Sequence, residues 1–270
     1  MTGVERSASG PRGNADVAPP PTPPTVPANP AVTSVSAFFP CYNDAPTIGG
    51  LVRDVHAVLE RIVPDFEVIV VDDGSTDGSG ALLDELAGEL PRLRVVHHER
   101  NRGYGGALIS GFAAASKDWV FYTDGDGQYD AREVGRLVEA ADLSTDIVQG
   151  WKIARGDPVH RRIIGRVYHH TVRTLFDLRV RDTDCDFRLI RRSLLERVPL
   201  HSTSGVICAE MMHGFARAGA KFVEVPVHHY HRPHGRSQFF RIPHLTRTAL
   251  QLLRLWWRVM VRGGSARAPR

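Results

Sequence analysis

The chain has 270 residues, of which 42% are hydrophobic and 24% are charged. This composition is that of an ordinary globular protein, and it excludes a fibrous or wholly disordered chain. Basic residues outnumber acidic residues by 34 to 30, but residues 225–270 alone contain nine arginines and no aspartate or glutamate. Subtracting these nine leaves 25 basic residues against 30 acidic ones in the rest of the chain. A basic C-terminal segment therefore follows a mildly acidic body, and nucleic acid is not an expected partner.

The three cysteines, Cys41, Cys185 and Cys208, stand far apart in the sequence and form no CxxC pair. Their spacing predicts neither a disulfide framework nor a cysteine zinc site, and it favours a reducing, cytoplasmic setting. The sequence shows no signal-peptide pattern and no uninterrupted run of about 18 apolar residues. Any membrane association is therefore expected to be peripheral.

Composition divides the chain into three regions. Residues 1–32 are expected to be a disordered leader, because seven prolines lie between residues 19 and 30 and almost no apolar side chain accompanies them. Residues 33–238 are expected to form one folded α/β domain. Residues 239–270 are expected to form a basic amphipathic helix and tail.

Short apolar runs and helical periodicity alternate from residue 34 onward. Strands are predicted over 35–39, 66–71, 93–96, 119–122 and 147–149, and helices over 48–62, 81–90, 106–115 and 134–141. Strands that alternate with helices of this length imply crossover connections, and therefore a mainly parallel sheet with helices on both faces. Sheets of this kind bind ligands beyond the carboxyl ends of their strands.

Candidate metal ligands follow the fourth predicted strand. Asp124, Asp126 and Gln128 supply oxygen atoms at alternate positions, and such hard ligands suit Mg²⁺ or Mn²⁺ bound to a diphosphate. Two carboxylates this close repel each other unless a cation lies between them. A solvated Asp-Gly turn is the alternative to a metal site. An EF-hand is excluded because Tyr129 stands where that loop needs glycine, and Gly135 stands where it needs glutamate.

Two further polar segments follow predicted strands. Asp72 and Asp73 end the second strand, where two acids suit the donor groups of a base or a ribose. The segment 101–107, Asn-Arg-Gly-Tyr-Gly-Gly-Ala, opens a helix after the third strand, so its backbone amides are expected to approach a ligand closely. This segment fits neither the Walker A spacing nor a dinucleotide-binding fingerprint.

Together these segments resemble those of the inverting family 2 glycosyltransferases of the GT-A fold, and within them the dolichol- or polyprenyl-phosphate sugar synthases. The resemblance extends over about residues 35–240. It rests on four ordered blocks and two later segments: 39–44 (FPCYND), 71–78 (VDDGSTDG), 101–107 (NRGYGGA), 124–128 (DGDGQ), 181–189 (RDTDCDFRL) and 224–237 (EVPVHHYHRPHGRS).

The resemblance implies roles for individual residues. Tyr42, Asp44 and Asp73 would hold the nucleotide base, Asp124 would face the ribose or diphosphate, and Asp126 with Gln128 would hold the metal ion. The nucleotide-sugar site would also include Pro40 and Gly103. Two positions depart from the family pattern, because Asp186 stands where glycine is usual and Asp44 stands where glutamate is commoner.

The acceptor is expected to be a phosphate. Most inverting transfers to a hydroxyl need a carboxylate base, and family members that use one carry a Glu-Asp pair near the acceptor. No such pair occurs here, and the nearest candidate, Glu210, lies in an apolar helical stretch where it could equally pair with an arginine. A polyprenyl monophosphate, with a second pKa of about 6, is largely dianionic at neutral pH and attacks without a base.

A phosphate acceptor needs positive charge around it, and arginine binds phosphate in a bidentate manner. We expect Lys152, Arg162 and Arg232 to supply this charge and, with Asp126, to form the catalytic set. Further candidates on the acceptor side are Arg161, Arg166, Arg188, Arg236, Ser237 and Glu210.

Helical projection of the C-terminal segment separates basic from apolar side chains. Arg247, Gln251, Arg254, Arg258 and Arg262 fall within roughly 80°, and opposite them lie Leu250, Leu253, Trp256, Trp257 and Met260. A wide apolar face with tryptophan beside an arginine stripe is typical of a helix in a membrane interface. A helix docked on the folded domain is the alternative.

The expected function is metal-dependent transfer of a sugar from a UDP- or GDP-sugar to polyprenyl phosphate, with inversion, at the cytoplasmic face of the cell membrane. A small membrane-embedded partner subunit is also expected, because related synthases often carry spanning helices in-chain or on another subunit. Three alternatives remain. They are a family 2 transferase acting on a hydroxyl acceptor in cell-envelope glycan or glycolipid synthesis, a non-catalytic protein with the same fold, and a phosphatase of the haloacid dehalogenase type, which also has Asp-x-Asp-Gly after a strand.

Overall fold

The computed structural model describes residues 29–153, 159–232, 234 and 242–262, without the side chains of 159–164, 242–245 and 262. Most of the predicted leader, residues 1–28, lies outside the described residues. Residues 29–32, which the sequence groups with the leader, pack on the domain. Val32 is fully buried, and Asn29 Nδ2 donates hydrogen bonds of 2.6 and 2.7 Å to the carbonyl oxygens of Val138 and Ala141.

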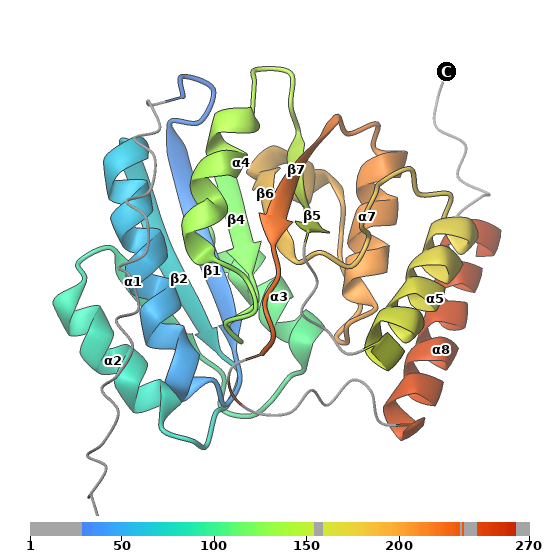
Figure 1. Cartoon of the computed structure of the whole chain (residues 1–270), viewed down its shortest axis with the longest axis horizontal. Coiled ribbons are helices and arrows are strands. Elements are labelled where there is room, and N and C mark those ends of the chain that lie inside the picture. The colour runs from blue at the N-terminus through green and yellow to red at the C-terminus, as the bar shows by residue number, and fades with distance from the viewer. Residues whose placement is uncertain (1–28, 154–158, 233, 235–241, 263–270) are drawn as a thin grey trace, which may run out of the picture.

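The described strands form a seven-stranded sheet in the order β3-β2-β1-β4-β6-β5-β7 (Figure 1). Their bounds are β1 Ser34–Cys41, β2 Asp65–Asp72, β3 Leu93–His97, β4 Trp119–Thr123, β5 Ile147–Ile153, β6 Phe187–Arg191 and β7 Phe222–His228. β1 pairs in parallel with β2 and β4, β2 with β3, and β5 with β7. β6 runs antiparallel to both β4 and β5, so the sheet is mixed but mainly parallel.

Helices cover both faces of the sheet because its central strands are apolar on both sides. Their bounds are α1 Ala45–Ile62, α2 Ser79–Glu89, α3 Tyr104–Ala114, η1 Ala131–Glu133, α4 Val134–Ala140, α5 Val159–Leu175, α6 Arg192–Arg197, α7 Ile207–Arg217, α8 Ile242–Trp256 and a short π-helical end, η2, Trp257–Arg262. Ala37 and Phe39 of β1 belong to a core cluster that includes residues of α1, α2 and α4, whereas Phe38 belongs to a second cluster that includes residues of α3, α5, α7 and α8. Successive side chains of β1 therefore belong to two separate hydrophobic cores.

The strands and helices predicted between residues 35 and 149 are confirmed, with ends that differ by at most four residues. The sequence did not predict β6, whose direction makes the sheet mixed. Within the part of the chain that the structure describes, no helix has both the length and the apolar character needed to cross a membrane.

Candidate active site

The loops after β1, β2 and β4 meet at the carboxyl edge of the sheet, as parallel neighbours must. Asn43 joins the first two loops, because its backbone N–H donates to Ser75 Oγ at 3.0 Å and its Oδ1 accepts from the Thr76 N–H at 2.8 Å. Thr47, in the first turn of α1, joins this region to the third loop, because its Oγ1 donates to the Gly125 carbonyl at 2.7 Å. The predicted strand-end segments are therefore brought together.

Gly125 allows this close approach. A Cβ atom at this position would lie 2.7 Å from the carbonyl oxygen of Pro40 and 3.3 Å from the side chain of Ile48. Pro40 is itself buried at the end of β1, so it cannot move aside easily. The Asp-Gly-Asp sequence thus brings two carboxylates to the end of β1 because the residue between them has no side chain.

Negative charge is concentrated at this edge. Burial raises the pKa of Asp124 well above its ordinary value, and the carboxylates of Asp186 and Asp126 raise it further. Burial likewise raises the pKa of Asp126 and of Asp44, and in both cases Arg232 opposes the rise. Among the described residues, Lys152 opposes the rise at Asp124 and Arg232 opposes it at Asp126 and Asp44, but neither cation outweighs burial. The edge is therefore suited to a positively charged ligand.

Arg232 reaches this cluster from the segment after β7. Its Nη2 donates to Asp44 Oδ1 at 2.9 Å, its Nη1 lies 3.9 Å from Asp126 Oδ2, and its Nε is buried with no hydrogen-bond partner among the described residues. The segment is held in place by Gln128, whose carbonyl accepts from the Tyr230 N–H at 2.7 Å and whose Nε2 donates to the Tyr230 carbonyl at 3.1 Å.

Asp73 is bonded to the protein backbone rather than exposed. Its Oδ1 accepts from the Arg102 N–H at 2.8 Å, its Oδ2 accepts from the Gly103 N–H at 3.0 Å, and His98 Nδ1 lies 2.6 Å from Oδ1. Asp73 therefore fixes the turn that begins α3. Its predicted contact with a nucleotide base stays a prediction. Tyr42, by contrast, has 47% of its surface exposed at the rim of the same edge.

Gly103 packs against the loop before α7. It has a φ of 82°, and a Cβ there would lie 2.6 Å from the Thr203 carbonyl oxygen, so both backbone and space require glycine. The neighbouring residue, Tyr104, is thereby placed so that its hydroxyl donates to Asp124 Oδ1 at 2.7 Å. The sequence pointed to segment 101–107 but not to this tyrosine, for which only its place inside the segment was a signal.

The charges of Lys152 and Arg188 are already paired within the protein. Lys152 Nζ donates to the Asp184 carbonyl and lies 3.7 Å from Asp184 Oδ2. Burial opposes its charge, but the carboxylates of Asp184 and Asp182 outweigh burial and raise the pKa of Lys152. Arg188 is fully buried, and its Nη1 donates to Asp186 Oδ1 at 2.6 Å.

Glu210 is also occupied by the protein. Its Oε2 accepts from the Ser202 N–H at 2.8 Å and from the His201 N–H at 3.2 Å, and its Oε1 forms an ion pair with Arg258 of η2. Glu210 is buried, with only 6% of the residue exposed. The pairing with arginine that the sequence left open is the one observed.

The remaining acceptor-side candidates are only partly described. Arg166 is exposed on α5. Arg161 and Arg162 lie on the same helix, but their side chains are outside the described residues, as are Arg236 and Ser237.

A divalent cation fits the donor set at the carboxyl edge. Asp124 and Asp126 offer two partly buried carboxylates, and burial raises the pKa of both. Among the residues that the structure describes, no group of three or more His, Cys, Asp or Glu side chains is placed to hold a metal ion alone. This arrangement suits Mg²⁺-type ions, which bind one or two carboxylates and take their other ligands from water and substrate phosphates.

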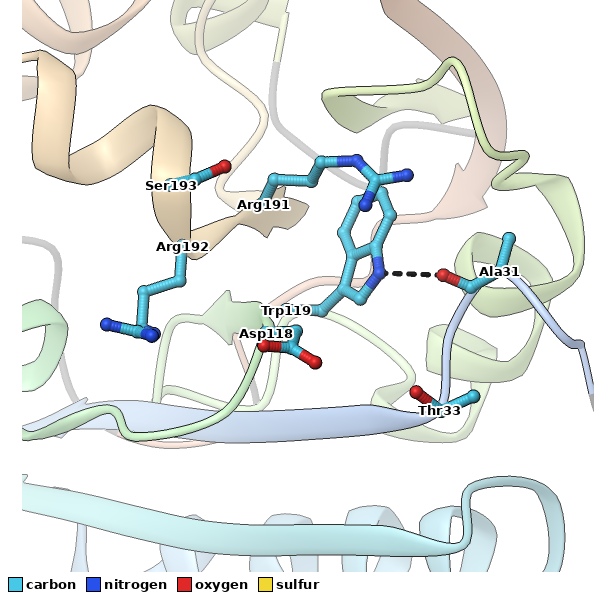
Figure 2. Close-up of a pocket in the computed structure, with 7 residues that line it drawn as sticks. All are labelled: Ala31, Thr33, Asp118, Trp119, Arg191, Arg192 and Ser193. Carbon is cyan, nitrogen blue, oxygen red and sulfur yellow. Dashed lines mark hydrogen bonds between the residues drawn. The ribbon is translucent and has the colours of Figure 1, made fainter.

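A separate cavity of about 300 Å³ lies at the opposite edge of the sheet (Figure 2). It is lined by residues at the start of β4 and the end of β6, where Arg191 stacks 4.4 Å from the ring centre of Trp119. Trp119 Nε1 donates to the Ala31 carbonyl at 3.0 Å, which anchors the segment leading into β1. Because it lies at the amino ends of the parallel strands, this cavity is not the candidate active site.

Residues 36–198 match the family described as Glycosyl transferase family 2. This match covers more than half of the chain. The chain belongs to this family. The family expected from the sequence is therefore confirmed.

Among curated relatives, an undecaprenyl-phosphate 4-deoxy-4-formamido-L-arabinose transferase of Enterobacter sp. (strain 638) is 30% identical over 210 residues, which are 77% of this chain and 63% of the relative. The glycosyltransferase AglD of Haloferax volcanii is 32% identical over 237 residues, which are 84% of this chain and 38% of the relative. This glycosyltransferase chain spans 60 to 63% of the length of the three arabinose-transferase relatives.

Solved structures share the fold. The glucosyl-3-phosphoglycerate synthase of Mycobacterium tuberculosis, in complex with Mn²⁺, UDP-glucose and phosphoglyceric acid, matches with a TM-score of 0.64 at 22% identity and covers 83% of this chain and 79% of its own. The mannosyltransferase PcManGT of Pyrobaculum calidifontis, in complex with GDP-Man and Mn²⁺, matches with a TM-score of 0.59 at 22% identity, over 87% and 65% of the two chains. The GT-A fold predicted from the sequence is confirmed.

Proposed function

We propose that this glycosyltransferase moves a sugar from a nucleotide-diphosphate donor to a polyprenyl phosphate, with inversion, at the cytoplasmic face of the membrane. The observation that carries the proposal is the pair Asp124 and Asp126, two partly buried carboxylates at the carboxyl edge whose pKa values burial raises. The names of the undecaprenyl-phosphate relatives support the acceptor class. The choice between UDP and GDP stays open.

The donor is proposed to lie across the loops after β1, β2 and β4. Tyr42 offers an exposed ring at the rim on which a base can stack, and Asp44 next to it offers acceptor oxygens. Pro40 and Gly125 fix the floor through their close approach. Asp73 orients the Gly103 turn, whose hydrogen-bonded backbone sets the position of Tyr104 and thereby of Asp124.

Mg²⁺ or Mn²⁺ would be held by Asp124 and Asp126, with Gln128 as a further predicted ligand. When bound, the ion would neutralise the charge that develops on the leaving diphosphate. Asp124 is oriented for such a role by Tyr104, and Asp126 by the Gln128 N–H, which donates to its Oδ1 at 3.0 Å. The preset orientation of both carboxylates lowers the reorganisation that charge stabilisation requires.

The acceptor phosphate is proposed to attack the anomeric carbon directly, because its oxygen is already ionised at neutral pH. Arg232, with its unpaired buried Nε, is the best-placed cation for a phosphate among the described side chains. Arg162, Arg161, Arg166, Arg236 and Ser237 are proposed to complete the acceptor side. Lys152 would act indirectly, by holding segment 182–186 through Asp184.

A hydroxyl acceptor is the second candidate, and the state of Glu210 disfavours it. A general base needs a carboxylate that is free to take a proton near the acceptor. Glu210 instead accepts two backbone hydrogen bonds and pairs with Arg258.

We also propose that a small membrane-embedded subunit assists access to the lipid.

The test is transfer by the purified chain from a panel of labelled UDP- and GDP-sugars to polyprenyl phosphate, with the parent polyprenol as the matched acceptor. Each reaction is run with Mg²⁺, with Mn²⁺ and with chelator. The proposal expects labelled lipid only with the phosphorylated acceptor and a divalent ion. Label on the free polyprenol, or on a soluble hydroxyl acceptor alone, would establish the second candidate instead.

A further inference from the structure

The last helix has three distinct sides rather than two. One side is docked on the domain, where Leu252 and Leu255 are 5% and 3% exposed and pack in the same core cluster as α3, α5 and α7. Ser204 Oγ donates to Gln251 Oε1 at 2.9 Å on this side, and Arg258 pairs with Glu210. The helix is therefore part of the folded domain (Figure 1).

A second side carries apolar side chains that the described protein leaves uncovered. Leu250, Leu253, Trp257 and Val261 are spaced three, four and four residues apart, so they lie along one side of the helix. They are 57%, 54%, 53% and 42% exposed. We call these four residues the apolar stripe. Four large apolar side chains exposed in one row on one helix mark an interaction surface rather than scattered surface residues.

Arginines occupy the third side, next to the apolar stripe. Arg247 and Arg254 are both exposed and seven residues, about two helical turns, apart. Arg254 also lines a cavity of about 310 Å³ between the helix and the loop before α7, together with Ser202 and Thr203. The hydroxyl and guanidinium groups around this cavity suit an anionic headgroup.

We propose that α8 and η2 form the surface by which the domain lies on a bilayer of anionic lipids. The apolar stripe would enter the boundary between headgroups and acyl chains, and Arg247 and Arg254 would face the headgroup phosphates. A tryptophan with an apolar body and a polar N–H suits that boundary. The inference goes beyond the proposed reaction, because it holds whichever sugar is transferred.

Charge favours a bilayer over a second copy of the chain. Two copies joined through this helix would bring their arginines together, and residues 225–270 hold no acidic residue to pair with them. An anionic bilayer supplies the missing negative charge and an apolar phase in one partner. A helix that lies on the membrane would also be connected to the candidate active site. The connection runs through Glu210 to the loop that packs on Gly103.

The test is flotation of the full-length chain with vesicles of phosphatidylcholine, with and without phosphatidylglycerol, in the absence of donor and acceptor. The double variant Leu253→Ser/Trp257→Ser should bind anionic vesicles roughly tenfold or more weakly than the parent chain. The double variant Arg247→Ala/Arg254→Ala should lose about fivefold for each charge and much of the salt dependence. All four side chains are exposed, so the melting temperature should be unchanged.

Matched controls are Leu143→Ser, which removes a leucine that is 84% exposed elsewhere, and Arg61→Ala on the exposed side of α1. Both should bind vesicles like the parent chain. Unchanged binding of the Leu253→Ser/Trp257→Ser variant would overturn the proposal. The proposal would also be overturned if the parent chain bound neither vesicle type but formed a dimer that the Leu253→Ser/Trp257→Ser variant abolished. Because no sugar is transferred in this assay, failure of the proposed reaction cannot produce either result.

Discussion

Arg232 Nη2 donates a 2.9 Å hydrogen bond to Asp44 Oδ1 across 188 residues of sequence. The contact closes the carboxyl edge of the sheet from the side of β7, and it places one guanidinium between the loop after β1 and the carboxylate of Asp126. Both carboxylates are partly buried, so the positive charge here is worth more than at an open surface.

Replacement of Arg232 should therefore impair turnover. Arg232→Ala is expected to lower kcat on the order of 100-fold, as for other charged groups that stabilise a transition state. Arg232→Lys should recover part of this loss, because lysine retains the charge but cannot bind in a bidentate manner. Arg61→Ala on α1 is the control, and steady-state transfer assays are the measurement. A fully active Arg232→Ala enzyme would remove this residue from the site.

Asp126→Asn should separate stability from activity. Burial and the nearby Asp44 raise the pKa of Asp126, so its charged form is unfavourable in the folded protein without a cation. The amide keeps an oxygen for the Gln128 N–H, and it should raise the melting temperature in chelator. Transfer should fall by at least about 100-fold. Equal melting temperatures of the parent chain and Asp126→Asn in chelator would show that its surroundings do not disfavour the charged carboxylate.

Gly125→Ala should disturb the floor of the site. The added Cβ would lie 2.7 Å from the Pro40 carbonyl oxygen, so one of the two loops must shift. We expect a loss of roughly tenfold or more in kcat/KM, since small displacements of positioning groups are costly. Gly50→Ala on α1 meets no atom within 4 Å, and it should stabilise the protein by about 0.5–1 kcal/mol without affecting transfer. Similar activities of the two variants would contradict the packing argument.

The pair formed by His97 and Asp72 should make stability depend on pH. His97 Nδ1 lies 3.0 Å from Asp72 Oδ2, and hydrogen bonding to Asp72 raises the pKa of His97 above its ordinary value of 6.5. Burial opposes the charge of Asp72, but hydrogen bonds from Ser75 and His97 outweigh burial and lower the pKa of this carboxyl below 3.8.

The two pKa shifts define the pH range in which the His97–Asp72 pair stabilises the fold. The contribution of His97 is complete below pH 6.5 and is lost as pH rises through the raised pKa, whereas that of Asp72 is present above pH 3.8 and is lost as pH falls through the lowered pKa. The melting temperature of the parent chain should thus exceed that of His97→Gln at about pH 5.5, and the difference should shrink by about pH 8.5. A difference that is constant with pH would assign the effect to packing.

Sequence patterns predicted local structure and the edge of the sheet well, because both depend on short-range periodicity. The alternation over 35–149 gave the strands, helices and loops that converge after β1, β2 and β4. Contacts between distant segments had no such signal. Neither the Arg232–Asp44 pair nor the Tyr104–Asp124 hydrogen bond follows from spacing, and the short β6 carries no mark of its direction.

The last helix shows the same limit. A two-sided projection grouped Arg258 and Gln251 with the other polar residues, whereas the structure turns both toward the domain. Trp256, grouped with the apolar face, packs partly against the core beside the buried Leu255. The positions of the docked side could be read only once the opposing surface of the domain was known.

The ion pair between Glu210 and Arg258 ties the last helix to α7. A chain shortened at residue 239 would strand an enclosed carboxylate and strip Leu252 and Leu255 from the apolar surface they cover. Weaker lipid binding by such a truncated protein would therefore not distinguish lost attachment from lost stability. Single-residue substitutions on the exposed side of the helix are therefore the way to release the enzyme from the membrane without unfolding it.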